Sequence, residues 1–101
     1  MTTIYELKFG KQALREWKAL DSSIQKQFEK KLAKIVQAPH VPSGRLHGYK
    51  NSYRLKLRKA GYRLGSKVYD DLVVVLVIAV GPRADDEVYD DFAFRYHEGE
   101  P

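Results

Sequence analysis

The first third of the chain alternates apolar and polar positions with two different periods. Between residues 5 and 9, apolar side chains occupy every second position, which predicts a half-buried strand that Gly10 ends. The following apolar positions recur at helical spacing and predict a helix; they are Ala13, Leu14, Trp17 and Leu20. Trp17 is therefore interpreted as a core residue.

A second helix is predicted after Asp21-Ser22-Ser23, a sequence that is typical of a helix N-cap. Ser22 and Gln25 have the spacing of a capping box. One apolar stripe runs along the helix through Ile24, Phe28, Leu32, Ile35 and Val36. Pro39 and Pro42 end it, and the two helices are expected to form a helical hairpin.

After a loop over residues 38–51, the period returns to two. Alternating runs predict strands at residues 53–58 and 62–69, joined by a turn at Arg58-Lys59-Ala60-Gly61. The continuous apolar run Leu72–Val80 predicts a central strand covered on both faces, entered by a tight turn at Asp70-Asp71 and ended by Gly81-Pro82. Residues 85–96 predict a last short helix.

The expected fold is therefore α+β in the order β-α-α-β-β-β-α. It has an antiparallel sheet of about four strands, with the N-terminal helical hairpin packed on one face and a short C-terminal helix. The 101 residues fit one domain, 1–101, whose tail after about residue 92 is a candidate for disorder.

The composition limits the kinds of site and the cell compartment that we expect for this domain. No cysteine is present, which excludes a disulfide framework and a thiolate metal site. The N-terminus lacks the apolar run of a signal peptide, and the nine-residue run Leu72–Val80 is too short to span a bilayer. We therefore expect a cytoplasmic protein with no membrane partner.

The net charge of +5 is concentrated in the second half of the chain. The segment 41–69 contains no acidic residue and eight basic ones: Arg45, Lys50, Arg54, Lys56, Arg58, Lys59, Arg63 and Lys67. His47 lies among them. Alternation places Arg54, Lys56 and Arg58 on one face, and Arg63 and Lys67 on one face of the next strand. Since like charges on neighbouring strands repel, these rows indicate an anionic partner; a merely solvated basic face is the alternative.

The sequence lacks the HExxH, CxxC and P-loop patterns. The acidic residues that a metal nuclease would need fall at a predicted turn and helix start. A metal-free ribonuclease, without a cofactor, fits better because RNA supplies its own nucleophile, the 2′-OH. Arginines suit the phosphate oxygens, and a lysine among arginines has its protonated form disfavoured, so Lys56 is a candidate general base. Arg83 is a candidate for transition-state stabilisation, and Tyr89 for stacking on a base.

Two segments carry a family resemblance. Residues 52–64, SYRLKLRKAGYRL, and residues 72–83 followed by Glu87-Val88-Tyr89 resemble conserved segments of RelE toxins. The N-terminal Phe9 and the run ALREWKAL, with Leu46 and Gly48 in the loop, are also similar, so the likeness covers about residues 4 to 90 in order.

The resemblance implies a ribosome-dependent mRNA interferase that cuts mRNA in the A site, leaves a 2′,3′-cyclic phosphate and stops translation. It also implies a cognate RelB-like antitoxin and, with it, binding to operator DNA that represses the operon. By position, Lys56 matches the general base, Arg63 and Arg83 the phosphate-binding and acid or stabilising arginines, and Tyr89 the tyrosine on the substrate. Arg54 stands where many members have lysine, and His47 where some have arginine.

The sequence departs from the family pattern at two places. Gly65-Ser66 replaces Val-Tyr, with Ser66 expected to face the core, and Pro82 replaces a lysine. Reduced activity is therefore one expectation. Two other functions stay open: a ParE-type toxin that inhibits DNA gyrase without catalysis, and a module that mainly binds antitoxin and operator DNA. Lys56, Arg63, Arg83 and Tyr89 together favour the ribonuclease.

Overall fold

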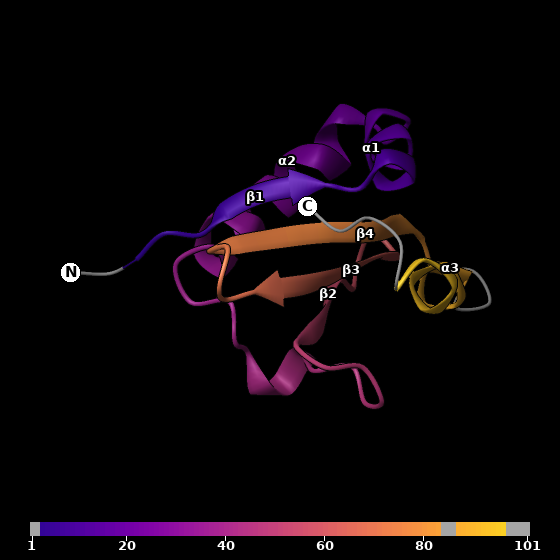
Figure 1. Ribbon diagram of the computed structural model, residues 1–101. Coiled ribbons are helices and arrows are strands. Elements are labelled where there is room, and N and C mark those ends of the chain that lie inside the picture. The colour runs from indigo at the N-terminus through magenta and orange to yellow at the C-terminus, as the bar shows by residue number, and fades with distance from the viewer. Residues whose placement is uncertain (1–2, 84–86, 97–101) are drawn as a thin grey trace.

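The computed structural model describes residues 3–83 and 87–96, and eight elements follow one another along the chain (Figure 1). They are β1 (Glu6–Phe9), α1 (Lys11–Lys18), α2 (Ser22–Ile35), the 3-10 turn η1 (Pro42–Gly44), β2 (Ser52–Leu57), β3 (Tyr62–Tyr69), β4 (Val74–Pro82) and α3 (Glu87–Arg95). This order confirms the predicted α+β fold. The last helix reaches Arg95, so residues 93–95 belong to the fold and not to a tail; residues 97–101 lie outside the described part.

The sheet is mixed rather than antiparallel, which corrects the expectation. Its strand order is β1-β4-β3-β2; β2, β3 and β4 form the predicted antiparallel meander, but β1 runs parallel to β4. The amide of Glu6 donates to the carbonyl of Val73 at 2.9 Å, and that of Gly10 to Val77 at 2.8 Å. Flanked by β1 and β3, β4 is the inner strand that its continuous apolar sequence predicts.

The apolar stripes of α1 and α2 form a core with one face of the sheet. Ala13, Phe28 and Leu32 are buried against side chains from β2, β3 and β4, namely Leu57, Leu64, Val77 and Val80. The ring of Trp17 packs between Phe9 and Phe28, with centroids 5.1 and 6.1 Å away. The core assignment of Trp17 and Phe28 is confirmed, and the two helices lie together on one side of the sheet (Figure 1).

The start of α2 differs from the prediction in detail. Asp21 is the N-cap residue, but no side chain caps the helix, and the expected Ser22–Gln25 capping box is wrong. The side-chain amide of Gln25 donates instead from Nε2 to the carbonyl of Trp17 at 2.8 Å. This bond joins the C-terminal end of α1 to the first turn of α2, so Gln25 holds the helical hairpin together.

The central strand begins and ends two residues later than the apolar run predicts. Residues 70–73 form the turn, with Val73 in the left-handed region at φ 55° and Leu72 51% exposed. At the other end, Gly81 and Pro82 pair with Arg63 and Tyr62 of β3, so they belong to the strand rather than ending it. A continuous apolar run contains no signal for either boundary.

The second face of the sheet is partly covered by α3. Val88 and Phe92 pack on Val74, Leu76 and other side chains of β4. A Cβ at Gly65 would lie 2.7 Å from Cδ2 of Phe92, so the glycine makes room for that ring. Ser66 is buried and faces the other core, as its parity predicts, and the β3–β4 register shifts at Gly65/Ser66. The departure from the family pattern at residue 65 is thus matched by the aromatic ring above it.

A half-buried ion pair joins α3 to α1 and the sheet. Arg95 donates from Nη1 and Nη2 to the two carboxylate oxygens of Glu16 at 2.8 and 3.0 Å, and from Nη1 to the carbonyl of Ile78 at 3.1 Å. Glu16 also accepts from the amide of Val80 at 3.3 Å. Since β1 pairs with β4 only as far as Val77, this pair satisfies backbone groups of β4 beyond the end of β1.

Candidate RNA-cleaving site

Lys56 of β2 and Arg63 of β3 are direct cross-strand partners. Their side chains therefore lie on the same face, the one on which α3 packs. Arg63 is 8% exposed and donates from Nη1 to the carbonyl of Tyr62 at 3.0 Å, while Lys56 is half-buried. On the other side of Arg63 the partner is Gly81, which has no side chain to crowd the guanidinium. The pair that sequence alternation predicts is thus formed.

Arg54 and Lys67 lie on the same face but in different surroundings. Arg54 is exposed and is the cross-strand partner of Gly65. The ammonium of Lys67 lies 4.3 Å from the ring centroid of Tyr96 and 4.9 Å from that of Tyr69. These cation–π contacts give Lys67 a role in packing the end of α3. Its predicted contact with RNA stays a prediction.

Arg83 and Tyr89 come from the segment that follows β4. The amide of Arg83 donates to the carbonyl of Gly61 at 2.7 Å, which fixes its backbone beside the β2–β3 turn, and its side chain is exposed. Tyr89 is half-buried on α3 and packs beside Val88 and Phe92. Arg83 thus follows the end of β4 beside the start of β3, and Tyr89 lies on the helix that covers the second face of the sheet.

The other predicted basic contacts are spread over two loops. Arg45, His47 and Lys50 are exposed in the loop before β2, and Arg58 and Lys59 are exposed in the β2–β3 turn. Arg58 therefore lies beyond the strand row that was predicted to contain it. The structure gathers Arg54, Lys56 and Arg63 on one sheet face and leaves these five at its borders.

Two features of the site were not found from the sequence. The ammonium of Lys31 on α2 donates to the carbonyl of Lys56 at 2.9 Å, at the free edge of β2. Even-numbered residues of β2 turn their backbone groups to this edge, since Ser52 accepts there from the amide of Leu46. No sequence pattern marks a lysine that binds a carbonyl 25 residues away.

The second feature is a polar network around Asp70. Its Oδ1 lies 2.7 Å from the hydroxyl of Tyr5 and 2.7 Å from Nε2 of His40, and Nδ1 of His40 lies 3.0 Å from the hydroxyl of Tyr53. The hydrogen bond from Tyr5 and then that from His40 lower the pKa of Asp70, and Asp70 in turn raises the pKa of Tyr5. His40 thus joins the loop 38–51 to the sheet.

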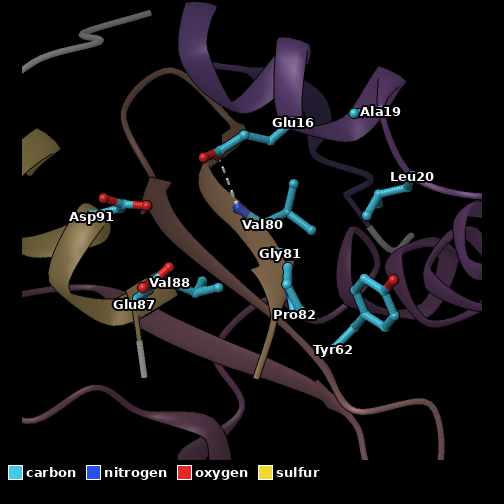
Figure 2. A pocket seen from close by; sticks show the side chains of 10 residues that line it. All are labelled: Glu16, Ala19, Leu20, Tyr62, Val80, Gly81, Pro82, Glu87, Val88 and Asp91. Atoms are coloured by element: carbon cyan, nitrogen blue, oxygen red, sulfur yellow. Dashed lines mark hydrogen bonds between the residues drawn. The ribbon is translucent and has the colours of Figure 1, made fainter. Parts of the chain in front are cut away.

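A hollow of about 290 Å³ lies between α1, the end of β4 and α3 (Figure 2). Carboxylates of Glu16, Glu87 and Asp91 line one side, and Figure 2 shows Glu16 reaching the amide of Val80. Three acidic side chains repel phosphate, so this hollow does not suit RNA.

Metal and membrane features were searched over the described residues 3–83 and 87–96. There, no group of three or more His, Asp or Glu side chains is arranged to hold a metal ion. In the same ranges, no helix is long and apolar enough to cross a membrane.

Comparison with known proteins shows to which class of protein the chain belongs. Residues 7–87 match the family model described as the ParE toxin of the type II toxin–antitoxin system parDE. A RelE-like toxin protein of Escherichia coli is 47% identical over 85 residues, which cover 84% of this chain and 90% of the relative. The mRNA interferase toxin RelE of Escherichia coli K12 is 42% identical over 91 residues, or 90% of this chain and 96% of the relative.

Solved structures agree. An arginine-substituted variant of the E. coli RelE toxin in the free state superposes with a TM-score of 0.84 at 40% identity, covering 91% of this chain and 97% of that one. The toxin in the E. coli RelBE toxin–antitoxin complex superposes with a TM-score of 0.75 at 42% identity. The match covers 77% of this chain and 95% of that one. Fold and cationic sheet face thus define a toxin of the type II toxin–antitoxin class. Within that class, the chain belongs to the RelE family.

Proposed function

We propose that this chain is the toxin of a type II toxin–antitoxin pair and that it cleaves mRNA in the A site of the translating ribosome. The observation that carries the proposal is the cross-strand pair of Lys56 and Arg63 on the α3 face of the sheet. Its relative in E. coli K12 is an mRNA interferase.

The residues divide the chemistry among them. Lys56 removes the proton of the 2′-OH, which attacks the adjacent phosphate and expels the 5′-oxygen. The 5′-oxygen takes up a proton from water, which leaves a 2′,3′-cyclic phosphate and a 5′-hydroxyl. Arg63 and Arg83 bind the phosphate oxygens and stabilise the charge of the transition state, and Arg54 adds positive charge beside them.

Contacts outside this centre hold the substrate. Tyr89 packs on the RNA, while Arg45, His47, Lys50, Arg58 and Lys59 bind RNA phosphates of the message or the ribosome. A RelB-like antitoxin is the expected partner, as in the RelBE complex of E. coli, and the pair represses its operon through operator DNA. The protein acts in the cytoplasm.

Primer extension on a translated mRNA tests the activity. Cuts inside codons are expected only while ribosomes translate, and a Lys56→Ala/Arg83→Ala double variant is expected to lose both the cuts and the growth arrest. Growth arrest that persists in the double variant contradicts the catalytic assignment. A Lys11→Ala/Lys18→Ala variant, changed on exposed positions of α1, is the matched control for lost charge.

The second candidate is inhibition of DNA gyrase, which the ParE name of the matching family model favours. Supercoiling by purified gyrase with and without the protein separates the two. Inhibition of supercoiling without any mRNA cleavage would assign the chain to that function.

A further inference from the structure

A hollow of about 230 Å³ lies along the outer edge of β2, on the α2 side of the strand and next to the backbone of Lys56. Apolar side chains of Ile35, Val41 and Leu55 contribute to its walls, together with the ring of Tyr53. Its remaining lining is Ser43, Gly44, Arg54, Lys56 and Arg58. Apolar walls with a cationic border are therefore combined at the edge of the strand that carries Lys56.

The aromatic wall of this hollow is held in place. The hydroxyl of Tyr53 is bonded to His40 at 3.0 Å, and His40 is bonded to Asp70 in the β3–β4 turn at 2.7 Å. The rings of His40 and Tyr53 also meet edge to face, with centroids 6.0 Å apart. A ring that His40 already holds in this way loses little freedom when a planar ligand stacks on it.

The opposite wall is set by Gly44. A Cβ at this position would lie 2.8 Å from the carbonyl oxygen of Arg54, so the glycine lets η1 approach the edge of β2. The backbone groups of Arg54 point to this same edge, as those of Ser52 and Lys56 do. The edge carbonyls of Ser52 and Lys56 are already bonded to the amide of Leu46 and to Lys31, so the hollow offers mainly aromatic and apolar surface.

We propose that this hollow is a nucleobase subsite. It takes one unstacked base of the single-stranded RNA next to the phosphate that is cut, an inference that rests on the proposed function. Bases of single-stranded RNA are recognised by stacking on aromatic side chains and by hydrogen bonds to their edges. Arg54 and Arg58 at the border bind the adjoining phosphates. The subsite gives the toxin its own preference for the base beside the cut.

Nuclear magnetic resonance of the full-length ¹⁵N-labelled protein tests this directly. Adenosine, cytidine, guanosine and uridine monophosphates are titrated against ribose 5-phosphate, which carries the same phosphate and sugar without a base. The nucleotides are expected to shift the amides of Val41, Ser43, Gly44 and Tyr53, and ribose 5-phosphate is expected to leave these four unshifted. Equal shifts with both ligands, or shifts that never reach these amides, overturn the proposal.

Two pairs of variants test the subsite by affinity. Ser43→Trp fills the hollow and is expected to weaken nucleotide binding about tenfold or more, while Ser22→Trp, on an exposed position at the start of α2, leaves it unchanged. Tyr53→Leu, which removes the ring, is expected to weaken binding about as much, and Tyr53→Phe, which keeps it, much less. Unchanged affinity in both Ser43→Trp and Tyr53→Leu contradicts the proposal.

These measurements do not depend on RNA cleavage. If the nucleotides bind at the hollow but the protein cuts no mRNA, the subsite stands and the proposed ribonuclease fails. If mRNA is cut and no base-dependent shift appears, the ribonuclease stands and the subsite fails.

Discussion

Gly65 of β3 lies directly against the ring of Phe92 of α3, and a Cβ on the glycine would meet Cδ2 of that ring at 2.7 Å. Gly65 is also the cross-strand partner of Arg54 on the cationic face. Packing of α3 and the shape of the site are therefore coupled at one position.

This contact predicts that Gly65→Ala destabilises the protein. The added methyl forces the buried Phe92 and α3 to shift, and overpacking of this kind costs about 1–3 kcal/mol. Urea unfolding measures the loss. Gly10→Ala is the control, because its Cβ would lie 3.4 Å from the carbonyl of Val77, an ordinary contact. Equal stability of Gly65→Ala and wild type would mean that α3 is not held against β3.

The sequence predicts what is local and periodic. Alternation placed Lys56 and Arg63 on one face, and helical spacing placed Phe28 and Leu32 in the core, because side-chain direction follows from the period. The matching of Gly65 to Phe92 joins residues far apart in the chain, so no local period reveals it.

The same limit applies to the sheet and to the polar contacts. Nothing in residues 6–9 says whether β1 runs parallel or antiparallel to β4, since alternation is the same in both cases. Glu16 and Arg95 are 79 residues apart, and both read as ordinary exposed helix positions. The start of β4 was missed because Leu72 and Val73 are apolar residues in a turn.

Glu16→Gln is expected to lower stability by about 1–3 kcal/mol. The amide cannot accept both hydrogen bonds from Arg95, whose side chain is only 13% exposed, and the guanidinium loses its main counter-charge. Thermal or urea unfolding measures the change. Asp91→Asn is the matched control, because Asp91 is 48% exposed and lies 3.6 Å from Arg95; it should cost less than about 1 kcal/mol. If the two variants lose the same stability, the Glu16–Arg95 pair contributes no more than the more exposed Asp91–Arg95 pair.

Replacing Lys56 by arginine separates its charge from its proposed proton transfer. Arginine keeps the positive charge but stays protonated across the usable pH range, so it cannot act as a general base. Lys56→Arg is expected to retain RNA binding within a few fold and to lose cleavage by at least about a hundredfold. Single-turnover cleavage and filter binding measure the two quantities. Arg54→Lys, which replaces an arginine by a lysine on the same face, is the control and should keep most of the activity.

The Asp70 network predicts a pH-dependent contribution to stability. The pKa of Asp70 is lowered in the folded protein, first by the bond from Tyr5 and then by that from His40. Its stabilising contribution is therefore present above the unfolded carboxyl pKa of about 3.9 and is lost as pH falls through the folded value. Asp70→Asn removes this contribution, so its stability should lie below that of wild type at pH 7, and the difference should shrink as pH falls below about 4.

The same network shifts the pKa of Tyr5 in the opposite direction to that of Asp70. Its pKa is raised by Asp70, so the contribution of its neutral hydroxyl is present below the usual tyrosine value of about 10 and is lost as pH rises through the folded value. Urea unfolding from pH 3.5 to 7, with a ¹³C-tyrosine titration at high pH, checks both ends. Asp71→Asn in the same turn is the control. If Tyr5 ionises at the same pH in Asp70→Asn and wild type, the carboxylate of Asp70 does not bind the hydroxyl of Tyr5.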